Sequence, residues 1–104
     1  MLNEEDILVL KPDGKDITSK VVSMSNLEVD VQYNNNKIYS YNKANLIIIQ
    51  NPVVINDCII KTVSKTLTNV IKILKFDNYI KVFFKNGTNK IYYQSDIIIE
   101  ENLL

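Results

Sequence analysis

The sequence contains no histidine and no arginine, and it has one cysteine and two glycines among its 104 residues. Without histidine, the chain lacks the side chain that ordinarily titrates near neutrality, and it has no histidine-containing triad or zinc site. The two glycines, Gly14 and Gly87, are too few for the glycine-rich loops that bind nucleotide phosphates. We therefore expect a protein that is not an enzyme, with no metal site and no cofactor.

The single cysteine, Cys58, cannot form an internal disulfide, which fits a reducing compartment. We expect it to be a small buried hydrophobic residue, because no imidazole is present to activate its thiol. No apolar run reaches the roughly 20 residues that a membrane-spanning helix needs. The acidic beginning "MLNEEDILVL" also differs from a signal peptide. We expect a cytoplasmic location and no membrane partner.

The residues that are abundant favour β-sheet. The chain has sixteen isoleucines and nine aromatic residues but one alanine. Branched and aromatic side chains fit a pleated sheet better than a helix. A hydrophobic fraction of 46% is ordinary for a folded protein, and the length suits one domain or two very small ones.

Two similar phrases stand about half a chain apart: "KIYSYNKANLIIIQN" from Lys37 and "KIYYQSDIIIEEN" from Lys90. The likeness extends backwards, since "LEVDVQYNNN" lies over "YIKVFFKNGTN". Both stretches alternate apolar and polar residues, which predicts strands with one buried face. The Asn-rich and Asn-Gly segments predict that each strand folds back as a hairpin. Each copy therefore predicts three strands joined by tight turns.

A short polar segment follows each hairpin, "NKAN" in one copy and "QSD" in the other, and three isoleucines come next. Such a segment predicts a single 3₁₀ turn, and the isoleucines predict a final strand buried on both faces. This outline is that of a small SH3-like barrel. We predict an all-β chain of two tandem SH3-like (Tudor-like) barrels, residues 1–51 and 52–104, with Pro52 at the junction.

One stretch leaves an α+β alternative open. Apolar residues of "CIIKTVSKTLTNVIKIL" also recur at helical spacing, so residues 58–74 could form one helix. Three threonines weaken that helix. The parallel with the first copy instead predicts a strand from about Val70.

The charges are unevenly distributed although the net charge is zero. Residues 61–95 carry seven lysines and one acid, with aromatic residues interleaved. A basic sheet face with aromatic rings can hold phosphates while bases stack, as small barrels that bind single strands do. Phe83 should point outward if its neighbours Val82 and Phe84 point inward. The predicted nucleic-acid contacts are Lys72, Lys75, Lys81, Phe83, Lys85, Lys90 and Tyr93.

Two other interpretations of the same residues stay open. The absence of arginine and the neutral net charge favour a structural role, in which Phe83 and Tyr93 pack between the repeats and the lysines keep the sheet soluble. In addition, the tyrosines at 33, 39, 41 and 92 could form an aromatic cage for a methylated side chain, provided that their rings converge.

The doubled pattern, above all "VIKILKFDNYIKVFFKNG" followed by "YYQSDIIIEENL", resembles tandem SH3-like modules at the C-terminus of large bacterial superfamily 1 helicases and related ATPases. The resemblance implies an accessory fragment whose ATPase motifs lie outside these residues. It implies DNA, RNA or other domains of the parent protein as partners. We expect a non-catalytic binding module that contacts nucleic acid through the second repeat. The alternative is a protein-docking module that uses an exposed strand edge or the isoleucine-rich strands.

Overall fold

The computed structural model describes residues 3–56 and 58–101, and these residues form an all-β structure. Within them the only helical elements are three 3₁₀ turns of three residues each, η1 (Thr18–Lys20), η2 (Lys43–Asn45) and η3 (Gln94–Asp96). The all-β prediction is confirmed. The helical alternative for residues 58–74 is wrong, because two strands and a loop occupy that stretch, and the second strand begins at Val70 as predicted.

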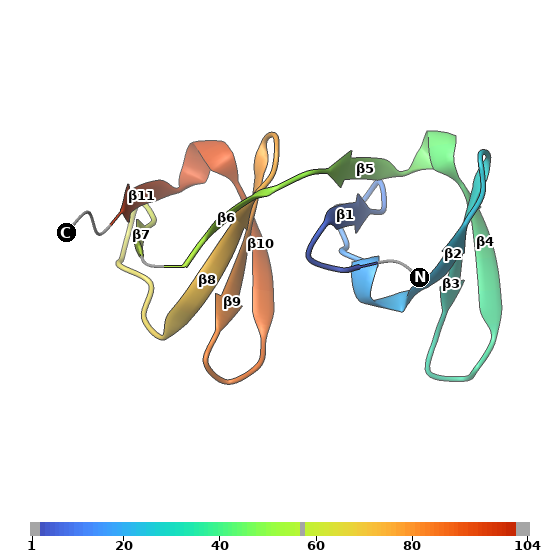
Figure 1. Cartoon of the computed structure of the whole chain (residues 1–104), viewed down its shortest axis with the longest axis horizontal. Helices are drawn as coiled ribbons and strands as arrows, with labels where there is room; N and C mark the ends of the chain where they lie inside the picture. The colour runs from blue at the N-terminus through green and yellow to red at the C-terminus, as the bar shows by residue number, and fades with distance from the viewer. Residues whose placement is uncertain (1–2, 57, 102–104) are drawn as a thin grey trace. The chain divides into compact units, whose positions relative to one another are not determined.

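The chain divides into two compact units, Met1–Asn51 and Pro52–Leu104 (Figure 1). The first unit holds two small antiparallel sheets. One pairs β1 (Ile7–Leu10) with β5 (Ile47–Gln50), and the other has the order β2 (Val21–Met24), β3 (Glu28–Gln32), β4 (Ile38–Asn42). The turn η2 comes between β4 and β5, where the sequence predicted a 3₁₀ turn.

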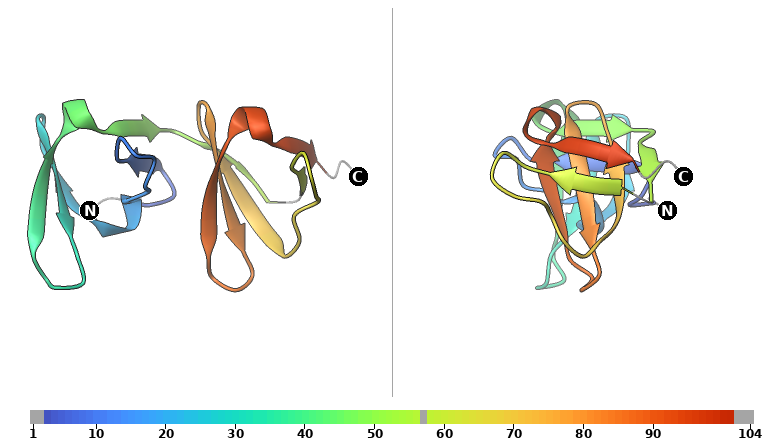
Figure 2. Two further views of the ribbon diagram at one scale, coloured as in Figure 1. Left: turned by 180° about the vertical axis from the view of Figure 1, so that it is seen from behind. Right: turned by 90° about the vertical axis from the view of Figure 1, so that its left-hand side faces the viewer.

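The second unit also has two antiparallel sheets. One pairs β7 (Cys58–Lys61) with β11 (Ile98–Glu101). The other has the order β10 (Asn89–Tyr93), β9 (Tyr79–Phe84), β8 (Val70–Lys75), β6 (Val53–Ile55). Figures 1 and 2 show the hairpins β3–β4 and β9–β10 as long twisted strand pairs. The second unit thus has one strand, β6, for which the described part of the first unit has no counterpart.

Strand pairings in the two units correspond at a constant offset in residue number. Leu10 pairs with Ile47 in the first unit, and Lys61 pairs with Ile98 in the second. At the same offset, Glu28 pairs with Asn42, and Tyr79 pairs with Tyr93. Strands β1 to β5 of the first unit therefore correspond in order to β7 to β11 of the second, and η2 corresponds to η3.

The matching "KIY" phrases do not occupy corresponding positions, which corrects the sequence-based alignment. Val31 pairs with Tyr39, and Val82, the counterpart of Val31, pairs with Lys90. Lys90, which begins the second "KIY", therefore corresponds to Tyr39, which ends the first. The two phrases are offset from each other by two residues. Because side chains in a strand alternate with a period of two, such a shift keeps each side chain on its predicted face. The sequence pattern could not reveal the shift.

Each unit has its own hydrophobic core, to which both of its sheets contribute. The buried members in the first unit are Ile7, Val9, Ile17, Val29 and Val31. Those in the second are Ile60, Ile73, Ile80, Val82 and Ile97, with half-buried Cys58 packed against them. One prediction about the isoleucine triplets is wrong. Ile98 is 62% exposed, since its neighbours Ile97 and Ile99 face the core and alternation turns Ile98 outward.

The turns depend on residues that tolerate positive φ. Asn36 and Gly87 occupy corresponding places in the two long hairpins, with φ of 64° and 86°. Each donates its N–H to the carbonyl of the residue three earlier, Tyr33 or Phe84. Gly14, with φ of 88°, closes the turn through Pro12 and Asp13 by donating its N–H to the Lys11 carbonyl. Asparagine and glycine are the residues that adopt this conformation most readily, so the predicted turns form where these residues stand.

Asp30 in the centre of β3 couples the three strands of its sheet. Its carboxylate accepts hydrogen bonds from Ser40 Oγ on β4 at 2.6 Å and from Ser23 Oγ on β2 at 2.7 Å. Both hydrogen bonds lower the pKa of Asp30 below its ordinary value of 3.8, and the bond from Ser40 has the larger effect. The ionised form is therefore favoured in the folded state.

We expect this carboxylate to stabilise the first unit at neutral pH and to lose that effect in acid. A lowered pKa gives stability that is present above the ordinary pKa and disappears as the pH falls through the lowered value. Asp30→Asn should therefore be less stable than the parent at pH 7, and the difference should shrink at about pH 3. Urea unfolding of both proteins at the two pH values measures this difference in stability. A difference that is constant with pH would contradict the assignment.

Candidate nucleic-acid interface

The structure divides the predicted nucleic-acid contacts among different places in the second unit. Lys85 and Lys90 are exposed and line two adjoining pockets. Lys75 ends β8 opposite Ile80 and is half-buried. The remaining predicted residues lie on the sheet face turned away from the core: Lys72, Lys81, Phe83 and Tyr93.

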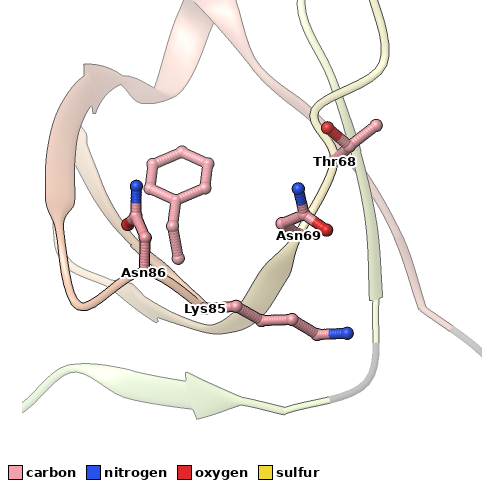
Figure 3. Close-up of a pocket in the computed structure, with 5 residues that line it drawn as sticks. Thr68, Asn69, Lys85 and Asn86 are labelled. Carbon is pink, nitrogen blue, oxygen red and sulfur yellow. The ribbon is translucent and has the colours of Figure 1, made fainter.

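The two pockets lie between the β7–β8 loop and the β9–β10 hairpin, and we call them the basic pockets. They have volumes of about 440 and 320 Å³ and share Thr68 and Phe84. Figure 3 shows the larger one, with Thr68 and Asn69 on one side, Asn86 on the other and the Lys85 side chain along its rim. Their lining residues are Lys65, Thr66, Leu67, Thr68, Asn69, Phe84, Lys85, Asn86, Lys90 and Tyr92.

Backbone hydrogen bonds hold the two walls of the basic pockets together. The Lys85 N–H donates to the Asn69 carbonyl at 2.8 Å, which ties the hairpin to the loop. Asn69 has φ of 60°, a conformation that asparagine tolerates better than most residues. The Leu67 N–H donates to the Ile60 carbonyl at 2.8 Å and anchors the loop on β7. The pockets are therefore built from hydrogen-bonded backbone on both sides.

The basic pockets are positively charged, because three lysines and no carboxylate line them. Lys65, Lys85 and Lys90 are all exposed. The Lys90 ammonium lies 5.0 Å from the centre of the Tyr92 ring, within the range of a cation–π contact. Two half-buried aromatic rings, those of Phe84 and Tyr92, belong to the same lining. Cations, amide groups and rings thus meet at one place.

The outward face of the larger sheet in the second unit carries a different arrangement. Phe83 points away from the core as predicted and is half-buried. The Lys72 and Lys81 ammonium groups lie 5.0 and 5.6 Å from the centre of its ring. However, Lys81 is 2% exposed, so it does not present its charge to solvent. Tyr93 is 60% exposed and contacts the ring of Tyr79, with centroids 5.5 Å apart.

Three of the four candidate cage tyrosines meet in the first unit. The rings of Tyr33 and Tyr39 contact edge to face at 5.3 Å, and the hydroxyls of Tyr33 and Tyr41 are 2.7 Å apart. The hydrogen bond with Tyr41, together with burial, raises the pKa of Tyr33 to about 12. The ammonium groups of Lys20 and Lys11 lie 4.9 and 5.7 Å from the Tyr33 and Tyr41 ring centres. Lysines of the chain itself therefore contact these two rings.

A pocket of the first unit corresponds in position to the basic pockets but differs in chemistry. It has a volume of about 470 Å³ and lies beside Tyr33, which is the counterpart of Phe84. Its lining holds one lysine and three amide side chains: Ser19, Lys20, Val22, Gln32, Tyr33, Asn34 and Asn36. Asn34 stands at the position of Lys85. The positive charge is concentrated in the pockets of the second unit.

Of the ten residues that line the basic pockets, only Lys85 and Lys90 were predicted as nucleic-acid contacts, and the residues that were missed include Lys65, Phe84 and Tyr92. Phe84 was predicted to point inward, and Tyr92 was considered as a cage residue, and both pack against the core of the second unit. Lys65 lies in a loop whose course no periodic pattern reveals. The repeated spacing of lysine and aromatic residues around the hairpin was the available signal, but it did not show which loop would face the hairpin.

Comparison of the chain with protein-family models, curated proteins and solved structures finds no match. Over residues 3–56 and 58–101, no helix is long and apolar enough to cross a membrane. The same part of the chain contains no group of three or more cysteine, aspartate or glutamate side chains that could hold a metal ion. The geometry of the two units is therefore the basis for the function proposed below.

Proposed function

We propose that the chain is a non-catalytic nucleic-acid-binding module and that its second unit binds a single strand at the basic pockets. The observation that supports this most directly is the meeting of three exposed lysines with two aromatic rings, in a lining that contains no carboxylate. Proteins that bind single strands combine a cationic surface for the backbone with rings on which bases stack.

Each part of the lining has a role in this proposal. The ammonium groups of the three lysines, Lys65, Lys85 and Lys90, neutralise phosphates of the strand. This attraction does not depend on the base sequence and supplies most of the affinity. The rings of Phe84 and Tyr92 supply apolar surface against which a base packs. The amides of Asn69 and Asn86 can donate to or accept from a base edge or a phosphate. Such a site favours strands whose bases are unpaired, because a duplex keeps its bases stacked inside.

We further propose that each unit is an SH3-like (Tudor-like) barrel and that the chain belongs to a larger nucleic-acid-processing protein of the helicase type. The barrel proposal is supported by five strands in common order, a 3₁₀ turn before the last strand and one core shared by two sheets. The assignment to a larger protein is supported by the resemblance of the repeated pattern to helicase C-terminal modules.

Binding of a fluorescently labelled oligothymidylate to the whole chain tests the proposal. We expect affinity that falls as salt increases, with a slope of log K against log salt of about −2 for three phosphate contacts on a single strand. Anisotropy titrations at several salt concentrations measure this slope. No anisotropy change at low salt would overturn the proposal, and a salt-independent affinity would overturn its electrostatic basis. A duplex of matched length should bind more weakly.

A protein-docking function is the second candidate, and one surface of the second unit favours it. On the outward face of the β7–β11 sheet, Ile59 and Ile98 are 41% and 62% exposed. An ion pair between Lys61 and Glu100 at 3.0 Å lies on the same face. Apolar side chains framed by paired charges are common at protein contacts. Oligonucleotide binding that fails at low salt would make this candidate the favoured one.

A further inference from the structure

The outer edge of β2 in the first unit has no partner strand among residues 3–56 and 58–101, whereas the corresponding edge in the second unit is paired. The larger sheet of the first unit has the order β2-β3-β4, and that of the second unit has the order β10-β9-β8-β6. Strand β6 lies antiparallel to β8, with Val54 opposite Leu74 and Ile55 opposite Ile73 (Figure 1). The two units thus differ at one edge of otherwise corresponding sheets.

The constant offset between the strand pairings of the two units locates the edge that corresponds to the β6 site. Ser23 pairs with Asp30, and Leu74 pairs with Lys81, so Ser23 and Leu74 are counterparts. Met24 and Lys75 correspond in the same way. The register shift in β8 lies between Val70 and Lys72, before residues 73–75 that pair with β6, whereas the shift in β2 lies between Val21 and Ser23. Because the shift in β2 precedes Ser23, a further strand can pair beside Ser23 and Met24.

The segment that enters the first unit forms a turn instead of a strand. The Glu5 N–H donates to Asn3 Oδ1, and the Asp6 N–H donates to the Asn3 carbonyl, both at 3.0 Å. Its residues "NEED" are poor strand formers, whereas β6 has the sequence "VVI". The difference in side chains explains why one unit fills this edge with its own chain and the described residues of the other do not.

The β2 edge carries no charged residue and no proline, although β2 is short and has a register shift, two other features that protect unpaired strands. Its sequence "VVSM" contains no lysine, no other charged residue and no proline, and Val22 is 46% exposed. Val22 also lines the pocket of about 470 Å³ in the first unit, beside three amide side chains. An edge of this kind can accept an additional strand through backbone hydrogen bonds.

We propose that the β2 edge binds an extended peptide segment of a partner protein, antiparallel to β2 and rich in consecutive branched residues of the Val-Val-Ile type. The occupied edge of the second unit supplies the chemistry of the ligand, since β6 shows which side chains suit this position. Backbone groups of Ser23 and Met24 supply the hydrogen bonds, and the exposed side chain of Val22 supplies an apolar contact. The inference is independent of nucleic-acid binding, because it concerns a different unit and a different ligand.

A synthetic peptide with the sequence of residues 51–56, "NPVVIN", tests the proposal against the isotopically labelled whole chain. We expect saturable amide shift changes in two-dimensional NMR spectra, confined to β2 and the adjacent η1. A peptide in which proline replaces the second valine cannot donate its central hydrogen bond, and we expect it to bind roughly tenfold or more weakly. The variant Val22→Lys places a charge at the edge and should weaken binding similarly, with the rest of the spectrum unchanged.

Three outcomes would overturn the proposal. One is the absence of any shift change at millimolar peptide. The second is a set of changes confined to β6 and β8, which would show exchange with the chain's own strand. The third is a concentration-dependent dimer of the free chain that Val22→Lys abolishes, because the β2 edge would then belong to a second copy. Equal binding of the valine and proline peptides would exclude pairing through the backbone.

Discussion

Replacing Ile80 by alanine is expected to destabilise the second unit by about 3 kcal/mol. The Ile80 side chain, near the beginning of β9, is fully buried and belongs to the core that both sheets of the unit share. The substitution removes three carbon atoms and leaves a cavity that the surrounding strands cannot fill. A unit of this size has a total stability of roughly 3–8 kcal/mol, so the loss is a large fraction of it. Urea unfolding followed by NMR amide signals of each unit measures the effect.

Ile98→Ala is the matched control for this substitution. It removes the same atoms from the same unit, but Ile98 is 62% exposed on the outward face of β11. We expect it to cost less than about 1 kcal/mol, since little apolar surface is returned to water. Similar losses for the two variants would show that the core of the second unit does not lie where the structure places it.

The double variant Lys85→Glu/Lys90→Glu is expected to weaken binding of a single-stranded oligonucleotide roughly 100-fold at low salt. The substitutions remove two of the three cations of the basic pockets and introduce two charges that repel phosphate. The remaining affinity should depend less on salt, because the slope falls by about 0.7 for each lost phosphate contact. Anisotropy titrations at several salt concentrations measure both quantities.

Lys15→Glu/Lys37→Glu is the control, since it makes the same change in net charge with two exposed lysines of the first unit. Both double variants are therefore also compared at physiological ionic strength, where charges are screened beyond about 8 Å and a change of net charge alone should have a small effect. We expect a loss of less than about threefold. Equal losses for the two double variants would contradict binding at the basic pockets and indicate attraction by total charge.

The local structure was predictable where short-range chemistry decides it. Alternation of apolar and polar residues predicted β3 and β9, because a half-buried strand has a period of two. Asparagine and glycine at positive φ predicted the hairpin turns. The short polar segments predicted the 3₁₀ turns η2 and η3. All of these features depend on neighbours within a few residues along the chain.

The candidate site was predictable in part. The concentration of lysines in the second half of the chain pointed to Lys85 and Lys90, which line the basic pockets. It also pointed to Lys81, which is 2% exposed. A strand pattern assigns residues to two faces but does not show what covers either face. It placed Phe84 in the core and could not show that this side chain also lines a pocket.

The residues by themselves determined that this chain is built from strands, where its tight turns fall, and that it contains no histidine. These properties follow from composition, period and turn chemistry, which act over short distances. Only the folded structure showed that the two KIY phrases are offset by two residues, that β6 pairs with β8, and that Lys65 lies in the same pocket lining as residues of the β9–β10 hairpin. These features join residues far apart in the sequence, and hydrogen bonds between distant strands and loops select them from arrangements that the same pattern allows.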